Sequence, residues 1–306
     1  MLKLVEDYDG SDEVVNRGVA DIVNASRMID CDMARAVRSI DASEAGEWFR
    51  DRGRESNCIA FLGSKIVGFS FMYDTASYTY LWIAVDPRIG LSMGVKVVEE
   101  LVEWGLRTRV RKGFRKPLRI GAGLEHGYMY TLLRRVLPSY VEEHSATLMH
   151  LEKVWTNAVE LRGYRVRRGG VEDYRVIAKI FNEAFSQYPW FRPWDPDYVR
   201  RYLENRKPVI FIVETIDGEP AGYIDAEVFE ALDRGRSAYI HTLAVKKSHR
   251  GRGLGKHLLA TMIKELMSLG IEPNRVFLDS VAGLEPLYRK LGFKDIRRYI
   301  AFKLCI

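Results

Sequence analysis

The chain repeats itself at a fixed spacing, and this repeat restricts its fold more than any other feature of the sequence. Residues 80–96, YLWIAVDPRIGLSMGVK, align with residues 240–256, IHTLAVKKSHRGRGLGK, at an offset of 160. The heptapeptides AGLEHGY at 122–128 and AGLEPLY at 282–288 align at the same offset. Two matches at one spacing, tens of residues apart, predict two copies of one domain.

The length of the chain fits this division. Its 306 residues are enough for two domains that each bury a core of their own. We expect the copies to occupy residues 1–155 and 163–306, with the boundary near residues 154–163.

The composition is that of a globular protein, with 47% hydrophobic and 29% charged residues. The opening residues MLKLVEDYDG turn acidic too early for a signal peptide, and the apolar runs have the length of strands and not of membrane spans. Cys31, Cys58 and Cys305 stand in no metal-binding or redox spacing, and the histidines form no paired-ligand pattern. We therefore expect a cytoplasmic protein with reduced thiols, no metal and no membrane partner.

Apolar periodicity in the second copy alternates between strands and helices. The segments PVIFIVET and EPAGYIDAEVFE are joined by the pair Asp217-Gly218, which predicts a β-hairpin. The predicted order β-α-α-β-β-β-α-β-α-β indicates a mixed α/β domain. The elements are strands at 164–168, 238–245, 275–280 and 297–304, a hairpin over 208–230, and helices at 171–185, 195–206, 253–270 and 285–292.

Three glycines, Gly251, Gly253 and Gly255, lie between the strand at 238–245 and the helix that follows it. Amides in the first turn of a helix have no intrahelical partner, and the helix dipole adds partial positive charge there. Glycines let phosphate oxygens approach these amides without a Cβ in the way. Because five basic residues occur in the stretch AVKKSHRGRGLGKHLL, this loop predicts a phosphate-binding site.

Spacing excludes two common phosphate loops. A Walker A loop would need Gly where Arg250 stands and Ser or Thr where His257 stands. A dinucleotide fingerprint that begins at Gly251 and Gly253 would need Gly in place of Lys256. A tight helix entry that binds no ligand remains the alternative.

The remaining pattern, Arg250-x-x-Gly253-x-Gly255 after a strand that ends in LAV, resembles motif A, Q/R-x-x-G-x-G/A, of the GNAT superfamily of N-acetyltransferases. The segment PLYRKLGF at 286–293 is similar to a second signature of that family. The resemblance covers residues 164–306 and, more faintly, the first copy. It implies an α/β fold of two tandem GNAT domains, each a mixed, splayed β-sheet flanked by helices. Tandem-GNAT proteins such as mycothiol synthase have this domain plan, although the mycothiol substrate is not implied.

The resemblance also implies acetyl-CoA as co-substrate. In the family, the strand before motif A diverges from its neighbour, and its free main chain pairs with the pantetheine arm. The glycine loop holds the pyrophosphate through its amides, with basic side chains beside it. The cofactor-binding residues expected on this basis are Leu243, Ala244, Val245, Arg250, Gly251, Arg252, Gly253, Leu254, Gly255 and Lys256.

Two side chains are candidates for the chemistry. Tyr288 matches the family's signature tyrosine and would protonate the leaving CoA thiolate, because a phenol with a pKa of about 10 stays protonated at neutral pH. His241 is predicted to deprotonate the acceptor amine. Strand alternation places it on one face with Tyr239, Leu243 and Val245. The alternatives are an aromatic side chain that only packs a short helix and a core histidine bonded to the backbone.

The acceptor pocket is expected near residues 186–198, SQYPWFRPWDPDY. Aromatic side chains there would contact an organic amine, with carboxylates near its charge, and packing alone is the alternative. The family's common Asn, seven residues before the tyrosine, is Val281 here, so another group must take its place. The substrate-contacting residues expected are Tyr239, Trp190, Trp194, Asp225 and Glu227.

The first copy has lost the basic loop. At the offset of 160, Gly253 and Gly255 face Met93 and Val95, and a loop one residue shorter restores only one glycine, Gly94. In neither alignment does the first copy have arginines at the positions of Arg250 and Arg252. We expect an N-terminal degenerate GNAT-like domain that binds acetyl-CoA poorly and completes the acceptor cleft of its C-terminal partner.

Charge is distributed unevenly along the chain. Residues 1–150 carry 20 Lys and Arg against 21 Asp and Glu, a net of −1, whereas residues 151–306 carry 27 against 20, a net of +7. An anionic ligand is therefore expected on the second half. The segment 107–119 has seven basic residues in thirteen. Because no nucleic-acid-binding module surrounds it, we interpret it as a solvated helix end and expect no nucleic-acid partner.

These features predict an acetyl-CoA-dependent N-acetyltransferase that acetylates a primary amine in its C-terminal domain. We expect a small-molecule amine or a peptide amine as acceptor and a monomer or homodimer as the assembly. Two alternatives stay open. One is a peptide or protein acetyltransferase that acts on an N-terminal amine or a lysine, and the other is a non-catalytic CoA-binding regulatory protein.

Overall fold

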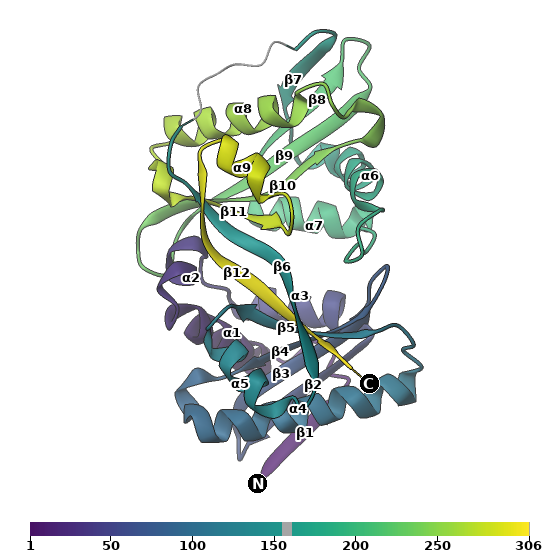
Figure 1. Cartoon of the computed structure of the whole chain (residues 1–306), viewed down its shortest axis with the longest axis vertical. Helices are drawn as coiled ribbons and strands as arrows, with labels where there is room; N and C mark the ends of the chain where they lie inside the picture. Colours follow the sequence, from purple (N-terminus) through teal and green to yellow (C-terminus); the bar gives the residue numbers. More distant parts are fainter. Residues whose placement is uncertain (155–160, 306) are drawn as a thin grey trace. The chain divides into compact units, whose positions relative to one another are not determined.

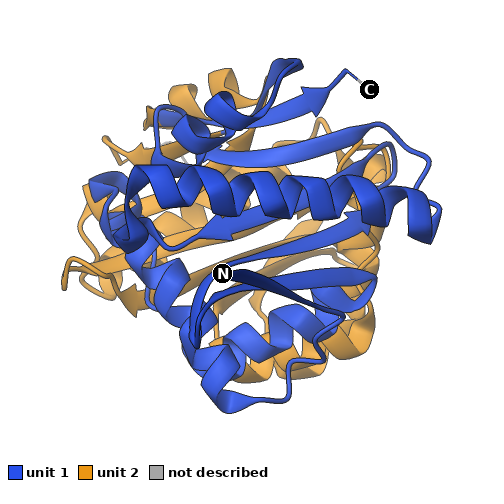
Figure 2. Cartoon of the chain, turned by 90° about the horizontal axis from the view of Figure 1, so that it is seen from below, with its two compact units in different colours: residues 1–146, 297–306 blue, residues 147–296 orange. Residues whose placement is uncertain are grey.

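The structure, a computed structural model, describes residues 1–154 and 161–305. The boundary predicted at residues 154–163 falls mostly on residues 155–160, outside the described part of the chain. The chain forms two compact units, drawn in two colours in Figure 2.

The first unit comprises residues 1–146 and 297–306. Its strands lie in the order β1-β2-β3-β4-β5, and the C-terminal part of β12 pairs antiparallel with β5. Helices α4 and α5 cover one face of this sheet, and α1 and α3 cover the other with side chains such as Phe49. Its elements (Figure 1) are β1 (Leu2–Glu6), α1 (Glu13–Met28), α2 (Cys31–Ala36), α3 (Ala42–Asp51), β2 (Ser56–Leu62), β3 (Lys65–Asp74), β4 (Thr79–Val85), α4 (Gly90–Lys112), β5 (Leu118–Leu124), α5 (Tyr128–Val136) and β6 (Tyr140–Leu151), whose last residues belong to the second unit.

The second unit comprises residues 147–296, and its elements follow the predicted order as far as α9. The strand predicted at 297–304 is the greater part of β12, and these residues are counted with the first unit. Its strands lie in the order β11-β10-β9-β8-β7. All pair antiparallel except β10 and β11, which run parallel. Its elements are β7 (Tyr164–Arg168), α6 (Tyr174–Phe185), α7 (Pro196–Arg206), β8 (Val209–Thr215), β9 (Pro220–Glu230), β10 (Arg236–Val245), α8 (Leu254–Ser268), β11 (Val276–Val281), α9 (Glu285–Lys290) and the start of β12 (Phe293–Leu304).

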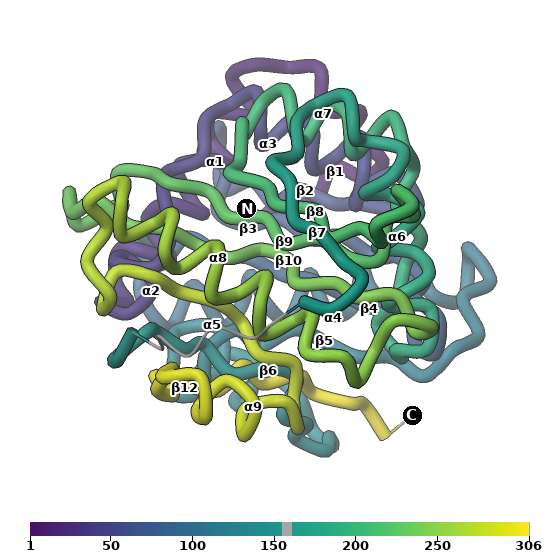
Figure 3. The backbone as a smooth tube through the Cα atoms, turned by 90° about the horizontal axis from the view of Figure 1, so that it is seen from above, coloured from purple at the N-terminus to yellow at the C-terminus, as the bar shows by residue number. Residues whose placement is uncertain are grey.

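The sheet of the second unit has a hydrophobic core on each face. On one face α8 packs side chains such as Leu258 and Met262 against Val276 and Leu278 of β11. On the other face α6 and α7 pack against β8 and β9, with Tyr223 fully buried. Figure 3 shows α8 and α7 on opposite sides of β9. The two faces therefore present different side chains to the two groups of helices.

Local sequence signals set the ends of the helices. The side chain of Asp195 accepts a hydrogen bond from the amide of Asp197, and Pro196 occupies the first turn of α7. Gly270 follows α8 with a φ of +77°, in the left-handed region where glycine carries no steric cost. Among the described residues, no helix is both long and apolar enough to cross a membrane.

Gly292, between α9 and β12, provides a test of this packing. It has a φ of +87°, and a Cβ built on it would overlap the carbonyl oxygen of Lys153. We expect Gly292→Ala to lower the free energy of unfolding by about 3 kcal/mol, from left-handed strain and overpacking together.

The matched control is Gly218→Ala, because Gly218 has a φ of +89° but no atom near its missing Cβ. It should cost only the backbone strain, about 1 kcal/mol. Urea denaturation of the full chain measures both changes, and equal losses would contradict the close packing assigned to Gly292.

Candidate functional site

Strands β10 and β11 separate part of the way along their length. They pair only at three positions, and the last pair is Ile240 with Leu278. On its other side β10 stays paired with β9 as far as Val245. The stretch that includes Leu243 and Ala244 therefore has a main-chain edge to which, in the described residues, β11 does not pair. A separated edge of this kind accepts an extended ligand by main-chain hydrogen bonds.

The glycine loop follows directly and opens α8. Gly251 and Gly253 have φ values of +77° and +80°, which explains why glycine stands at both positions. The first intrahelical bond runs from the amide of His257 to the carbonyl of Gly253, and no side chain within 1–154 and 161–305 caps the helix. The three amides before His257 are thus available to a ligand.

The space beside these amides is open. Among the residues that the structure describes, no atom lies within 4 Å of a Cβ built on Gly251, and only a methyl group of Val245, at 3.9 Å, approaches one built on Gly255. The glycines are therefore not required by tight packing within the protein. An anion at the start of α8 would find unpaired amides and the positive end of the helix dipole.

The basic residues of the loop differ in what they contact. The guanidinium group of Arg250 donates hydrogen bonds to the carbonyls of Val245 (3.1 Å) and Ala184 (2.7 Å), so it ties the loop to β10 and to the end of α6. Arg252 lies over the ring of Tyr164, at 6.0 Å, and Lys256 is exposed. Arg252 and Lys256 are thus two cations that the loop presents at its surface.

Tyr288 lies on α9, half-buried against the core that α8 covers. Its ring contacts Phe293 edge to face, with centroids 6.0 Å apart. Burial, with Tyr188 nearby, raises the pKa of Tyr288 to about 12. In the described part of the chain its hydroxyl has no hydrogen-bond partner, so a protonated phenol is available to an incoming ligand.

A buried carboxylate holds the turn that leads into α9. Glu285 accepts hydrogen bonds from the amide of Gly283 (2.8 Å) and the hydroxyl of Thr147 (2.9 Å). Glu285 is 6% exposed. It therefore positions the helix that carries Tyr288.

The alternation predicted for β10 is wrong at its centre. His241 is the extra residue of a β-bulge in the pairing of β10 with β9. Leu243 and Val245, after the bulge, pack into the core that α8 covers. Tyr239, before the bulge, pairs with Glu227 and lies on the opposite face. A bulge shifts the side-chain alternation by one residue, so a strict period of two does not hold through it.

Glu227 joins His241 to helix α7. One of its carboxylate oxygens, Oε2, lies 3.2 Å from Nε2 of His241 and 3.0 Å from Nη1 of Arg206. An ionised carboxylate only accepts hydrogen bonds, so Nε2 is the nitrogen of His241 that carries the hydrogen. His241, which is exposed, is therefore held through Glu227 by the pair of Glu227 and Arg206 at the point where β10 and β11 separate.

Asp225 lies deeper on the same side of the sheet. The hydroxyl of Tyr202 donates a hydrogen bond of 2.6 Å to its Oδ2. Burial raises the pKa of Asp225, which the hydrogen bond and the charge of His241 only partly oppose. Asp225 thus supports the wall of the site from α7 and β9.

The predicted aromatic residues of the acceptor loop pack onto the second unit. The ring of Trp194 stacks on Phe181 with centroids 3.7 Å apart. The side chain of Asn182 bonds both the amide and the carbonyl of Trp194. Trp190 contacts Phe185 and Tyr188. These contacts give the loop a fixed shape, and substrate contact by Trp190 and Trp194 stays a prediction.

Asp279 of β11 was not expected from the sequence. Loss of hydration raises the pKa of Asp279 to about 6, and a hydrogen bond from Tyr239 and the charge of His241 oppose this rise. The side chain is nevertheless exposed to solvent. A sequence signal for it was present, since in the segment RVFLDS it alternates with Val276 and Leu278 and so lies opposite the residues that face α8.

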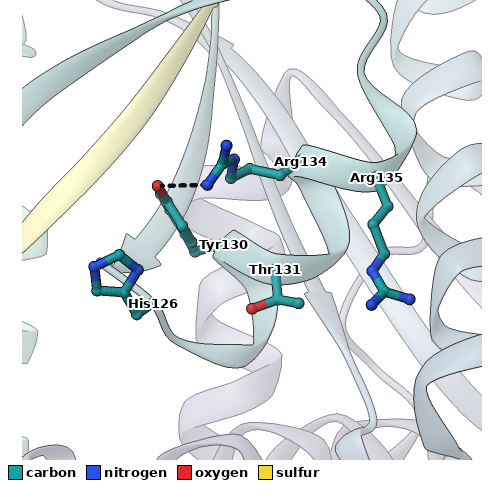
Figure 4. A pocket seen from close by; sticks show the side chains of 5 residues that line it. All are labelled: His126, Tyr130, Thr131, Arg134 and Arg135. Carbon is teal, nitrogen blue, oxygen red and sulfur yellow. Dashed lines mark hydrogen bonds between the residues drawn. The ribbon is translucent and has the colours of Figure 1, made fainter.

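Two cavities lie away from these residues. One, of about 360 Å³ in the first unit, is lined by His126, Tyr130, Thr131, Arg134 and Arg135 (Figure 4). The other, of about 420 Å³ in the second unit, lies between the start of α6 and the end of α7. Neither is lined by a predicted site residue.

The corresponding loop of the first unit is built around an acidic residue. Asp86 is fully buried and contacts Arg88 (2.7 Å) and Lys65 (2.9 Å). Burial alone would raise its pKa, but hydrogen bonds from Arg88 and Lys65 hold it below its ordinary value. A Cβ on Gly94 of α4 would overlap the buried hydroxyl of Tyr128, so the tyrosine closes the start of this helix.

The basic segment at 107–119 is largely neutralised within its unit. Arg111 pairs with Glu6 at 2.5 Å, and Arg107 pairs with Glu103 at 2.6 Å. Ion pairs to acidic residues of this unit also involve Lys112, Lys116 and Arg119. This pairing favours the interpretation of a solvated helix end.

Comparison with known proteins matches the second half of the chain to one family. Residues 175–293 match the family model described as acetyltransferase (GNAT) family. An uncharacterized N-acetyltransferase of Archaeoglobus fulgidus is 26% identical over 141 residues, which cover 44% of this chain and 92% of that protein.

Solved structures match the whole chain. A tandem GNAT protein from the clavulanic acid biosynthesis pathway has a TM-score of 0.65 at 16% identity, with 99% of this chain and 98% of that chain covered. A GCN5-related N-acetyltransferase from Sphaerobacter thermophilus has a TM-score of 0.62 at 15% identity, with 98% and 94% covered. At these identities the likeness is one of fold, and it confirms the predicted tandem architecture.

The role assigned to Glu285 can be tested by its removal. We expect Glu285→Ala to lower the free energy of unfolding by about 2 kcal/mol, because the amide of Gly283 and the buried hydroxyl of Thr147 lose their acceptor. The control is Glu272→Ala, an exposed carboxylate that caps no helix, which should change stability by less than about 0.5 kcal/mol. Similar losses in urea denaturation of the two variants would contradict the role.

Proposed function

We propose that this chain, which has a tandem-GNAT fold and a GNAT acetyltransferase domain in its second half, transfers an acetyl group from acetyl-CoA to a primary amine. The observation that carries the proposal is the uncapped start of α8 beside the unpaired edge of β10. The helix start offers amides to a diphosphate, and the strand edge offers main-chain groups to an extended arm. Coenzyme A has both a diphosphate and such an arm, whereas a simple phosphate has neither.

The residues that hold acetyl-CoA follow from this geometry. The amides of residues 251–256 would bind the pyrophosphate, with Arg252 and Lys256 as neighbouring cations. The main chain of residues 243–245 would pair with the pantetheine arm. Arg250 would act through the loop, because its guanidinium group already bonds two backbone carbonyls.

Acetyl transfer makes two demands on protons. The amine must be neutral to attack the thioester carbonyl, and the thiolate that leaves must be protonated. Tyr288 is suited to the second task, because its raised pKa keeps the phenol protonated across the physiological pH range. His241 and Asp279 are two groups near the acceptor side that can take a proton from the amine.

The acceptor side of the site has an acidic character. Asp225, Glu227 and Asp279 face it from two strands, against Arg206 and His241. This excess of carboxylates favours an acceptor that arrives as an ammonium ion. Tyr239 and the loop residues Trp190 and Trp194 would contact its organic part.

The first unit would not bind acetyl-CoA in the same way. Its loop holds the buried carboxylate of Asp86, and the hydroxyl of Tyr128 occupies the space beside Gly94. The filled space at the start of α4 opposes a diphosphate there, whereas the charge of Asp86 is balanced by Arg88 and Lys65. We therefore assign catalysis to the second unit alone.

The proposed function is tested by release of free thiol from acetyl-CoA with a panel of amines. Tyramine, spermidine and a short peptide with a free α-amine cover small aromatic, polycationic and peptide acceptors. We expect turnover with at least one class, and a loss of about 100-fold or more in kcat for Tyr288→Phe with little change in acetyl-CoA affinity.

Tyr174→Phe serves as the control, because Tyr174 lies on α6 and packs in the core on the other face of the sheet. It should keep the wild-type rate. Binding of acetyl-CoA without thiol release across the panel would reject the enzyme and favour a regulatory CoA-binding protein.

A further inference from the structure

We propose that Asp279 of β11 is the catalytic base that takes the proton from the acceptor amine. This inference rests on the proposed acetyl transfer and names the group that performs one of its steps. It assigns the role to a residue that the sequence motifs do not include, in place of His241.

The position of Asp279 follows from the strand pairing. Leu278 forms the last pair between β11 and β10, so Asp279 is the first residue of β11 beyond the point of separation. Leu278 packs in the core that α8 covers, and Asp279 therefore points to the other face of the sheet. Tyr239 lies on that same face, because it pairs with Phe277 and Glu227.

The groups around Asp279 come from four elements. On β10, the hydroxyl of Tyr239 donates a hydrogen bond to the carboxylate, and His241 contributes positive charge when protonated. On β6, His150 lies over the ring of Phe277, at 6.4 Å. On β9 and α7, the pair of Glu227 and Arg206 contacts His241.

This setting suits a base that works at neutral pH. Although Asp279 is exposed, the protein around it removes part of the hydration of the carboxylate and raises its pKa to about 6, so it is ionised at pH 7 yet basic enough to accept a proton. An acceptor ammonium beside it replaces some of the hydration that the protein has removed. Its open path to solvent lets the proton leave after each turnover.

His241 is less suited to the same step. Its Nε2 is engaged with Glu227 at 3.2 Å, and Glu227 is itself fixed by Arg206 at 3.0 Å. The imidazole is thus held in the bulge of β10 as part of an ion-pair network. We assign it a positioning role, in which its charge lowers the pKa of Asp279.

The first unit lacks the carboxylate at the equivalent position. In the strand pairing, Gly121 lies two residues beyond the partner of Tyr80, as Asp279 lies two residues beyond the partner of Tyr239. At the sequence offset of 160, Arg119 stands in the place of Asp279, so neither alignment gives a carboxylate. A Cβ on Gly121 would overlap the hydroxyl of Tyr80, so no larger side chain fits there. The base is therefore specific to the unit that has the open glycine loop.

The protons balance as follows in this mechanism. The acceptor ammonium gives one proton to the Asp279 carboxylate, and the neutral amine attacks the thioester carbonyl. The C–N bond forms, the C–S bond breaks, and Tyr288 protonates the CoA thiolate. The second proton lost from nitrogen restores the Tyr288 phenol, and Asp279 passes its proton to water. The net products are the amide, free CoA and one proton.

The test is the pH dependence of kcat/KM, measured by thiol release from the full-length chain with the best amine of the panel. We expect wild-type kcat/KM to fall tenfold per pH unit below about pH 6, as Asp279 becomes protonated. Asp279→Asn should lower kcat/KM by about 100-fold or more. It should also abolish the fall of kcat/KM at low pH, which we call the acid limb of the profile. Asp279→Glu should keep part of the wild-type kcat/KM and part of the acid limb.

Two further variants separate the candidates. Tyr239→Phe removes a hydrogen bond to the carboxylate, so it should raise the pKa and move the acid limb to higher pH. His241→Asn removes a positive charge, so it should keep the limb and move it in the same direction. Asp217→Asn, at an exposed turn, should leave the profile unchanged.

The outcomes are distinguishable. A wild-type rate or an intact acid limb in Asp279→Asn overturns this inference and leaves the acetyl transfer standing. Loss of the limb in His241→Asn instead would assign the base to His241. If Asp279→Asn does not fold, an unshifted limb in Tyr239→Phe overturns the inference alone. A wild-type chain that releases no thiol overturns both proposals.

Discussion

The separation of β10 from β11 is the constraint on which the proposed site depends. A continuous sheet would pair every main-chain group of β10 between Thr242 and Val245, and it would leave no edge for a ligand. On the other edge of β10, which pairs with β9, the bulge at His241 falls at the same place along the strand. The separation therefore creates the edge, exposes Asp279, and delivers the chain into the glycine loop, all within a few residues.

The two units show how one fold can keep or lose such a site. Lys246, at the start of the second unit's loop, is 6% exposed and lies near Glu183 and Glu219. Asp86, at the equivalent position of the first unit, is a buried carboxylate with cationic partners. The buried residue at this position therefore has opposite charge in the two units, and in each unit it is balanced by partners of the other sign, although strands and helices follow the same order.

The sequence alone was enough to predict the repeat, the order of elements and the glycine loop, because these depend on local periodicity and on residue types with strong conformational preferences. It did not predict the face on which β10 side chains lie, since a bulge is set by pairing with a neighbouring strand. It placed Arg250 at the phosphate, which stays a prediction, but it could not show that the guanidinium group bonds the carbonyls of Val245 and Ala184, the latter 66 residues away. Asp279 was missed because its hydration and neighbours follow from tertiary packing.

The most direct measurement of the central claim is the amide NMR spectrum of the full-length chain labelled with ¹⁵N in glycine only, recorded as acetyl-CoA is added. The account predicts large shifts for the amides of Gly251, Gly253 and Gly255, which lie in the loop that would hold the diphosphate. The amides of Gly90 and Gly94, at the start of α4, should not shift. Shifts of equal size at Gly90 and Gly94, or binding that leaves the three loop glycines unchanged, would contradict it.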